Sequence, residues 1–301
     1  MTAGISPHRV LITGAAGRIG RAAITQFASH GTEVTALDLH DPGDLGAARV
    51  FVGDASDSLL VERALEGFGP DDAVVHLAAI PSPTLDTAMR VYSSNATAAF
   101  AVLDTAGRLG VRRAAMASSM AIYGMAFADV LTPLPYLPVD EQMPVQIADP
   151  YALAKLAAEN AAQYCHRRYG MTVVSLRLPY VGADERLAFI HDRPASHPRA
   201  AAEVWAYLHT EDAARAFRLA TLVTEPGAHV VLLAAPETTS DEATESLLAR
   251  HFPDVARRAV FSGRSVPVDT SRARELLGFV PERLYQRQCQ PASDERSRIR
   301  A

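Results

Sequence analysis

Cysteine is scarce in this chain of 301 residues, and Cys165 and Cys289 lie far apart in the sequence. Neither forms a CxxC pair or a cysteine/histidine cluster with zinc-ligand spacing, which argues against a disulfide framework and a structural zinc site. His191 and His197 also lack the spacing of a helical histidine pair, so we expect no metal. A reducing cytoplasm is the location that this cysteine usage favours.

Long apolar runs and an excess of one charge are also missing. No apolar run approaches bilayer-spanning length, and residues 1–7 lack the basic and apolar regions of a signal peptide. The 29 Lys and Arg against 34 Asp and Glu give a net charge of -5, which offers no basic surface for nucleic acid or anionic lipid. With 49% hydrophobic residues the chain can bury a large core. We therefore expect a small-molecule substrate, and neither nucleic acid nor a membrane as partner.

Short β-branched runs alternate with longer Ala-rich segments. We predict strands at residues 9–13, 33–37, 48–52, 73–77, 113–117, 172–176 and 229–234, and helices at 18–30, 57–67, 95–110, 150–169 and 244–251. This rhythm predicts an α/β fold with a doubly wound, Rossmann-like parallel sheet and a small C-terminal substrate-binding lobe. The proline-rich stretches 132–150 and 179–198 are predicted to be loops.

The expected division follows from this pattern. Residues 1–178 form mainly the dinucleotide-binding domain, and residues 179–285 form an interleaved substrate lobe with elements that return to the sheet. Residues 286–301 are a polar tail.

A glycine-rich turn connects the first predicted strand to the first predicted helix. Its residues run from Thr13 to Gly20 and include Arg18 and Ile19. Gly14 permits a tight turn, Gly17 lets backbone N–H groups approach a pyrophosphate, and Gly20 allows close packing of the helix on the strand. The position of this pattern between a strand and a helix predicts dinucleotide binding.

Two acidic residues follow the next two predicted strands. Asp38 comes about twenty residues after the turn, where a carboxylate accepts both ribose hydroxyls of NAD and repels a 2′-phosphate. We therefore expect NAD as cofactor in preference to NADP. Asp54, followed by Ala55, is placed to accept from the adenine amino group, although it could instead cap the helix that begins near Asp57.

The fourth strand leads into small residues that would let the backbone pass close to a dinucleotide. They are Leu77, Ala78 and Ala79, which follow His76. We interpret His76 as a packed strand residue rather than as an acid or base.

Tyr151 and Lys155 lie one helical turn apart, so both side chains project from one helix face. An ammonium group beside a phenol favours the phenolate, and an oxidised nicotinamide adds positive charge, which lowers the tyrosine pKa toward the operating pH. Such a pair alone is more often structural. Here Ser119, which ends the fifth strand, adds a hydroxyl that can bind a reacting carbonyl oxygen.

These motifs cover almost the whole chain, and together with Asn95 and Arg177 they resemble the extended short-chain dehydrogenase/reductase family. That family, the NAD-dependent epimerases and dehydratases, contains sugar-nucleotide epimerases, dehydratases and related reductases. The resemblance implies that Ser119, Tyr151 and Lys155 are catalytic and that Asn95 is a supporting polar residue.

The resemblance also implies that Pro179 and Tyr180 lie near the nicotinamide amide. Two departures from the family pattern narrow the range of substrates that we expect. Met120 and Ala121 replace the Asp-Glu pair that dehydratases use, and the diphosphate-clamping Asn and Arg of UDP-sugar epimerases are missing. Losing one charge-assisted bond to a diphosphate costs on the order of 2 to 3 kcal/mol.

A smaller substrate follows, similar to that of the uronate dehydrogenases, which oxidise a free sugar acid. Candidate substrate contacts are Ser119, Met120, Tyr180, Arg186, Arg193 and Trp205. Either arginine can receive a carboxylate, and Trp205 can line a sugar-stacking wall or pack in the core.

The leading hypothesis is an NAD-dependent oxidoreductase acting on a sugar-like or small hydroxyl or carbonyl substrate. The alternatives are an NAD-retaining nucleotide-sugar epimerase and a non-catalytic dinucleotide-sensing regulator. The resemblance further implies a homodimer, formed through the helices predicted at 95–110 and 150–169.

Overall fold

The computed structural model describes residues 5–127 and 133–285. The predicted polar tail and Cys289 therefore lie outside the described residues. The central element is a seven-stranded sheet with the order β10-β7-β5-β4-β1-β2-β3, and all of its strand pairs are parallel. Its strands are β1 (Arg9–Thr13), β2 (Glu33–Asp38), β3 (Arg49–Val52), β4 (Ala73–His76), β5 (Arg113–Ser119), β7 (Thr172–Leu178) and β10 (Ala228–Leu232).

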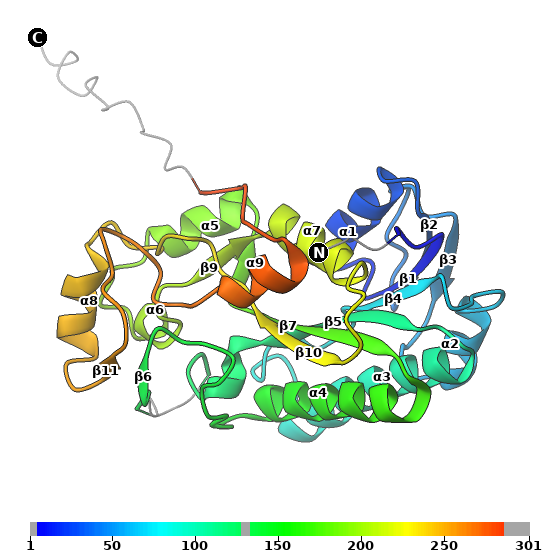
Figure 1. Cartoon of the computed structure of the whole chain (residues 1–301), viewed down its shortest axis with the longest axis horizontal. Coiled ribbons are helices and arrows are strands. Elements are labelled where there is room, and N and C mark those ends of the chain that lie inside the picture. The colour runs from blue at the N-terminus through cyan, green and yellow to red at the C-terminus, as the bar shows by residue number, and fades with distance from the viewer. Residues whose placement is uncertain (1–4, 128–132, 286–301) are drawn as a thin grey trace, which may run out of the picture.

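Helices cover both faces of this sheet (Figure 1), which confirms the predicted doubly wound fold. One face packs against α1 (Arg18–Ala28), α7 (Thr210–Ala220) and α9 (Ser271–Leu277). The other packs against α2 (Ser58–Ala64), α3 (Ala88–Arg108) and α4 (Pro150–Tyr169).

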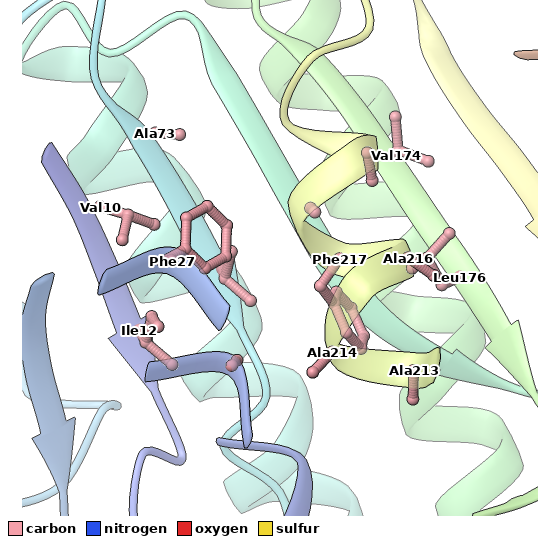
Figure 2. Packing of buried hydrophobic residues seen from close by; sticks show 14 of the residues in the cluster. Val10, Ile12, Phe27, Ala73, Val174, Leu176, Ala213, Ala214, Ala216 and Phe217 are labelled. Atoms are coloured by element: carbon pink, nitrogen blue, oxygen red, sulfur yellow. The ribbon is translucent and has the colours of Figure 1, made fainter. Parts of the chain in front are cut away.

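The alternation of side chains along β1 shows why one strand supports both layers. Val10 and Ile12 are fully buried on the α1 side, where Phe27 covers them, and Phe217 of α7 lies against neighbouring strands of the same face (Figure 2). Leu11 points to the opposite layer, among residues of α2 and α3. A strand buried on both faces is continuously apolar, as expected for a parallel sheet.

A second, smaller lobe lies at one end of the sheet, on the left in Figure 1. It contains β6 (Tyr136–Leu137), β8 (Tyr180–Gly182), β9 (Tyr207–His209), β11 (Ala256–Arg257), α5 (Asp184–His191), α6 (Pro198–Ala202) and α8 (Thr244–His251). The strands pair as β11-β6 and β8-β9. Helix α8 has the bounds that the sequence predicted, residues 244–251.

Three predictions about local structure are wrong. The stretch 179–198 is not a loop, because β8 and α5 lie within it, and the stretch 132–150 contains the short strand β6. Helix α3 begins at Ala88 rather than at residue 95, because Thr87 accepts a hydrogen bond from the Arg90 N–H and caps it. Prolines mark the ends of elements here, as in α6 where Pro198 is at the first turn.

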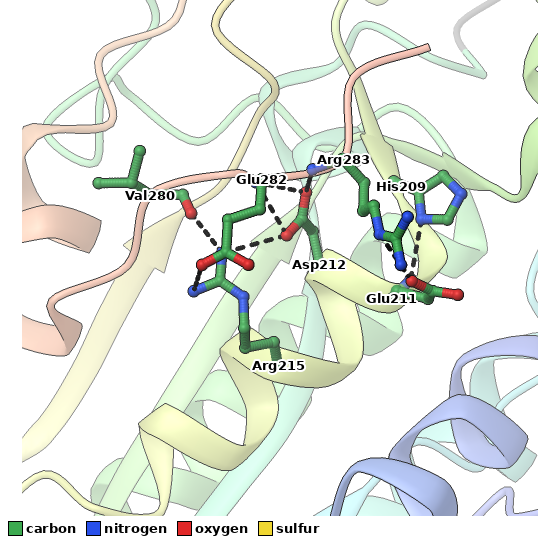
Figure 3. Close-up of polar contacts among 7 residues, drawn as sticks. All are labelled: His209, Glu211, Asp212, Arg215, Val280, Glu282 and Arg283. Carbon is green, nitrogen blue, oxygen red and sulfur yellow. Dashed lines mark hydrogen bonds and ion pairs between the residues drawn. The ribbon is translucent and has the colours of Figure 1, made fainter.

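The last described segment is fastened to the start of α7 (Figure 3). The Asp212 carboxylate is almost fully buried and accepts hydrogen bonds from the backbone N–H groups of Glu282 and Arg283, at 2.9 and 2.8 Å. Arg215 pairs with Asp212 at 3.1 Å and with Glu282 at 3.3 Å. These contacts bring the chain back across the face that α7 and α9 share. Among the helices of residues 5–127 and 133–285, none has the length and apolar character needed to cross a membrane.

Candidate functional site

The glycine-rich turn closes tightly against the neighbouring strand. Gly14 has a φ of 71°, and a Cβ on it would lie 2.5 Å from the Ala78 nitrogen. A Cβ on Gly20 would lie 2.1 Å from the Gly14 oxygen, so only glycine allows α1 to pack this closely. Gly17 is the N-cap of α1, and no side chain caps that end. The backbone N–H groups at this helix start therefore stay available to an anion such as a pyrophosphate.

Asp38 lies beside this turn at the end of β2. Its two carboxylate oxygens accept hydrogen bonds from the backbone N–H groups of Ala16 at 2.9 Å and His40 at 3.0 Å. These bonds hold the carboxylate next to the start of α1. A carboxylate at this place fits the ribose of a dinucleotide whose pyrophosphate lies at the helix start.

Asp54 does not cap α2. The cap is Asp57, which accepts from the Leu59 and Leu60 N–H groups. Asp54 is exposed, and its carboxylate accepts a local bond from the Ser56 N–H at 2.8 Å, while Ala55 is buried.

The end of β4 carries a buried histidine. His76 Nδ1 lies 2.8 Å from the Thr13 hydroxyl, and burial lowers the pKa of His76 to about 3. The imidazole is therefore neutral and packed at physiological pH. Leu77 and Ala79, the residues beyond it, line the central cavity described next.

A cavity of about 520 Å³ extends from this turn to the smaller lobe. Ser119, Tyr151 and Lys155 all line it, and Arg18 and Ile19 form its edge at the start of α1. Ser119 ends β5, while α4 supplies the other two because Asp149 caps that helix through the Ala152 N–H at 2.8 Å. The structure thus brings the predicted trio together from two elements.

Lys155 is the only lysine of the chain. Its Nζ donates a hydrogen bond to the Ala117 oxygen at 2.8 Å and lies 5.4 Å from the centre of the Tyr151 ring. Burial lowers the pKa of Lys155 to about 8, and the Glu159 carboxylate opposes that shift. The Lys155 amine therefore loses its proton at a lower pH than an exposed lysine does, and at pH 7 it is still mostly protonated.

In the protein without a bound cofactor, the pKa of Tyr151 is not lowered as we expected from the sequence. Burial raises the pKa of Tyr151 to about 12, and the hydrogen bond with Ser119 only partly offsets this. The Lys155 ammonium alone therefore does not bring the phenol near the operating pH. A second positive charge beside the ring is needed to favour the phenolate further.

Below this trio lies a buried network that we did not foresee from the sequence. The Glu159 carboxylate accepts from Ser118 Oγ at 2.6 Å and from Arg177 Nε at 2.9 Å, and its other oxygen lies 2.8 Å from Arg177 Nη2. Arg177 also donates to the Tyr123 hydroxyl at 2.8 Å. The network joins α4 to the ends of β5 and β7, next to Ser119 and one turn beyond Lys155.

Asn95 lies on α3 and is buried. Its side chain accepts from the Ile80 N–H at 2.7 Å and donates to the Ile80 oxygen at 3.0 Å. Both ends of the Asn95 amide are thus hydrogen-bonded to the segment after β4. Ala79 and Pro81 of that segment line the cavity.

Most predicted substrate and nicotinamide contacts line the cavity. They are Met120, Pro179, Tyr180, Arg186 and Arg193, and the Arg186 guanidinium lies 5.0 Å from the Tyr180 ring centre. Trp205 does not belong with them, and the idea of a Trp205 stacking wall is corrected. The Trp205 side chain is 1% exposed, its ring packs against Phe252 at 6.0 Å, and its N–H donates to the Ala195 oxygen.

Three further lining residues escaped the sequence interpretation. Phe127 packs edge-on against Tyr151 at 5.8 Å, and Arg199 and Glu203 lie at the α6 side of the cavity. No local motif marks them, because Arg199 and Glu203 reach the site through the packing of α6 and Phe127 lies in the segment that follows β5. In the part of the chain that the structure describes, no group of three or more His, Cys, Asp and Glu residues is placed to hold a metal ion.

Comparisons with known proteins agree with this geometry. Residues 10–234 match the NAD dependent epimerase/dehydratase family. The chain is similar to the UDP-glucose 4-epimerase of Corynebacterium glutamicum, with 26% identity over 91% of both chains. It is also similar to the dTDP-glucose 4,6-dehydratase of Streptomyces niveus, with 30% identity over 91% of this chain and 88% of that one.

A crystal structure of a short-chain dehydrogenase/reductase superfamily protein from Agrobacterium tumefaciens, with bound NAD, is similar in fold. The TM-score is 0.69 with 26% identity, covering 92% of this chain and 93% of the other. The chain therefore belongs to the NAD dependent epimerase/dehydratase family, within the extended short-chain dehydrogenases/reductases. The predicted family and enzyme class are confirmed, and NAD is the cofactor of this class.

Proposed function

We propose that this protein is an NAD-dependent oxidoreductase acting on a sugar-like or small hydroxyl or carbonyl substrate. The observation that carries the proposal is the single cavity lined by Ser119, Tyr151 and Lys155, which starts at the glycine-rich turn and ends at the smaller lobe. The uncapped start of α1 and the Asp38 carboxylate fit the pyrophosphate and ribose of NAD. When bound there, NAD supplies the hydride acceptor and a positive charge.

In this proposal Tyr151 moves the proton. As a substrate hydroxyl is oxidised, its proton passes to the Tyr151 phenolate oxygen, and in the reverse direction the phenol returns it to the substrate oxygen. Ser119 donates a hydrogen bond to that oxygen. Lys155, held by the Ala117 oxygen, keeps a positive charge near the Tyr151 ring that favours the phenolate.

The cofactor preference rests on Asp38. Because its carboxylate is fixed beside the turn, it favours the free ribose hydroxyls of NAD and repels the 2′-phosphate of NADP. We further propose that Asp54 and Ala55 contact the adenine end and that Leu77, Ala78, Ala79 and Pro179 contact the remainder of the dinucleotide.

The substrate end of the cavity is rich in arginine. Arg186, Arg193 and Arg199 line it, so an anionic group on the substrate finds charged donors there. A free sugar acid fits this positively charged character. Screening NAD reduction with free uronic acids, neutral aldoses and UDP-sugars tests the proposal, and the uronic acids are expected to give net NADH.

An NAD-retaining nucleotide-sugar epimerase is the second candidate, favoured by the similarity to a UDP-glucose 4-epimerase. It uses the same trio but turns over without a net change in the absorbance of reduced nicotinamide. Substrate conversion without NADH would thus favour the epimerase. A dinucleotide-sensing regulator, the third alternative, is excluded if Tyr151→Phe abolishes a measured turnover.

We also propose a homodimer formed through α3 and α4. Apolar side chains are exposed along these helices: they are Met89, Tyr92, Phe100, Leu153 and Tyr164. Phe100 and Tyr164 lie side by side across the two helices, with ring centres 5.7 Å apart. Light scattering tests this, and a monomer for the wild type would refute it. A cytoplasmic location, which the sparse cysteines favour, remains part of the proposal.

A further inference from the structure

The α6 side of the cavity combines arginines with a single carboxylate. Among the described residues that line the cavity, the positively charged ones are Arg18, Lys155, Arg186, Arg193 and Arg199, and Glu203 is the only acidic one. Such a surplus of positive charge attracts any anion, including a diphosphate. The position of the one negative charge therefore decides how well a more highly charged ligand is accepted.

Glu203 is held by a tightly bonded turn. Its backbone N–H donates to the Arg199 oxygen at 3.1 Å, and its oxygen accepts from the Ala206 N–H at 2.9 Å. Val204 and Trp205 follow with φ of 44° and 53°, a left-handed conformation that is strained for bulky side chains. The buried Trp205 ring helps to fix the backbone of this turn beside the cavity.

The Glu203 carboxylate makes no ion pair within 4.0 Å in the part of the chain that the structure describes. Burial raises the pKa of Glu203 to about 7, although Arg193 and Arg199 act to lower it. Above pH 8 the group is therefore mostly ionised. A partly desolvated and unpaired carboxylate costs free energy, which suggests a role in recognition rather than in stability.

We propose that Glu203 is a specificity-determining residue that selects against nucleotide sugars by repelling their diphosphate. Tyr151 and Glu203 line the same cavity, so a substrate that reacts at Tyr151 and extends a further group toward α5 and α6 brings that group to Glu203. A free sugar with one anionic group either does not contact Glu203 or contacts it through a hydroxyl, so no like charges are brought together. A diphosphate brings two like charges close to it, and such repulsion discriminates between partners. This inference rests on the proposed function, because it assumes that substrate reacts at Tyr151.

The test is ligand binding by calorimetry to the NAD-loaded protein at pH 8.5, with UDP and D-glucuronate as probes. Glu203→Gln keeps the side-chain shape and removes the charge, and Glu185→Gln on the exposed face of α5 is the control with the same charge change. We expect Glu203→Gln to bind UDP at least tenfold more tightly than the wild type, with a smaller change for D-glucuronate. The control should match the wild type for both probes.

Equal UDP affinities for the wild type and Glu203→Gln, or no measurable UDP binding to either, would overturn the inference. So would an equal gain for both probes, because it would mean general charge repulsion rather than selection. Glu203→Met provides a second uncharged side chain should the glutamine variant melt early. The proposed function fails separately, if wild-type protein converts UDP-glucose without net NADH while no free sugar acid is oxidised.

Discussion

Replacing Glu159 by glutamine tests whether this buried carboxylate sustains the charge of Lys155. Residues four apart on a helix have Cβ atoms about 5–6 Å apart, and two opposite charges about 6 Å apart attract by roughly 3 kcal/mol at an effective dielectric constant of about 20. The Arg177 guanidinium, 2.8 Å from the carboxylate, stays in place in this variant. Removing the carboxylate alone therefore loses the whole attraction, and proton binding by Lys155 weakens by about 100-fold.

The Lys155 pKa is expected to fall when Glu159 loses its charge. Glu159 raises the pKa of Lys155 and burial lowers it to about 8, so removing the carboxylate moves that pKa below 8. The ammonium is then lost at a lower pH. Because the proposed mechanism needs it to favour the Tyr151 phenolate, the alkaline limb of the activity profile moves to lower pH as well.

The assay uses the fact that Lys155 is the only lysine. Isotopic labelling of lysine gives a single side-chain NMR signal, whose titration reports this pKa directly. Glu159→Gln leaves Arg177 buried without its partner, which costs about 3–5 kcal/mol of unfolding free energy. The double variant Glu159→Met with Arg177→Met avoids that unpaired charge while still removing the carboxylate.

Glu62→Gln is the control, because it breaks an exposed ion pair with Arg108, 2.7 Å apart, far from the site. Its lysine titration should match the wild type and its stability should change by less than about 1 kcal/mol. An unchanged Lys155 midpoint in folded protein, in both Glu159 variants, would refute the electrostatic reasoning.

Three further variants probe the site. Tyr151→Phe should lower turnover by about 10²- to 10⁴-fold while NAD affinity, followed by calorimetry, changes little, and retained turnover would contradict the proton-transfer role. Asp38→Asn should weaken NAD binding by about tenfold and narrow the preference over NADP, whereas an unchanged ratio of the two affinities would contradict the ribose contact. Gly20→Ala should weaken NAD binding and lower the unfolding free energy by about 1–3 kcal/mol, because its Cβ would lie 2.1 Å from the Gly14 oxygen. Gly69→Ala, whose Cβ meets nothing within 4 Å, is the control for that variant, and equal effects of the two would contradict the close-packing argument.

Local patterns in the sequence were enough for the sheet and the cofactor turn. A strand buried on both faces must be apolar throughout, and the glycines of the turn are required by contacts as short as 2.1 Å, so both features are written into neighbouring residues. The pairing of Tyr151 with Lys155 could also be predicted from the sequence, because residues four apart on a helix share a face whatever surrounds them.

The substrate end depended on the tertiary structure. The sequence predicted a loop over residues 179–198, but α5 forms there because its apolar residues Leu187 and Ile190 find partners such as Tyr207 from a distant strand. Likewise, no sequence pattern next to Glu203 predicts that this residue lines a cavity. Its role depends on where α6 packs and on a buried tryptophan.

The sequence by itself determined the fold class, because strand and helix periodicity is local. It also predicted the trio, because helical spacing puts Tyr151 and Lys155 on one face and the family resemblance implies Ser119 beside them. Only the tertiary structure decided the protonation of the trio and the lining of the substrate end. The pKa values of Tyr151 and Lys155 depend on burial and on Glu159, whose Ser118 and Arg177 partners come from β5 and β7. Burial is a property of the whole packed chain, and no local pattern contains it.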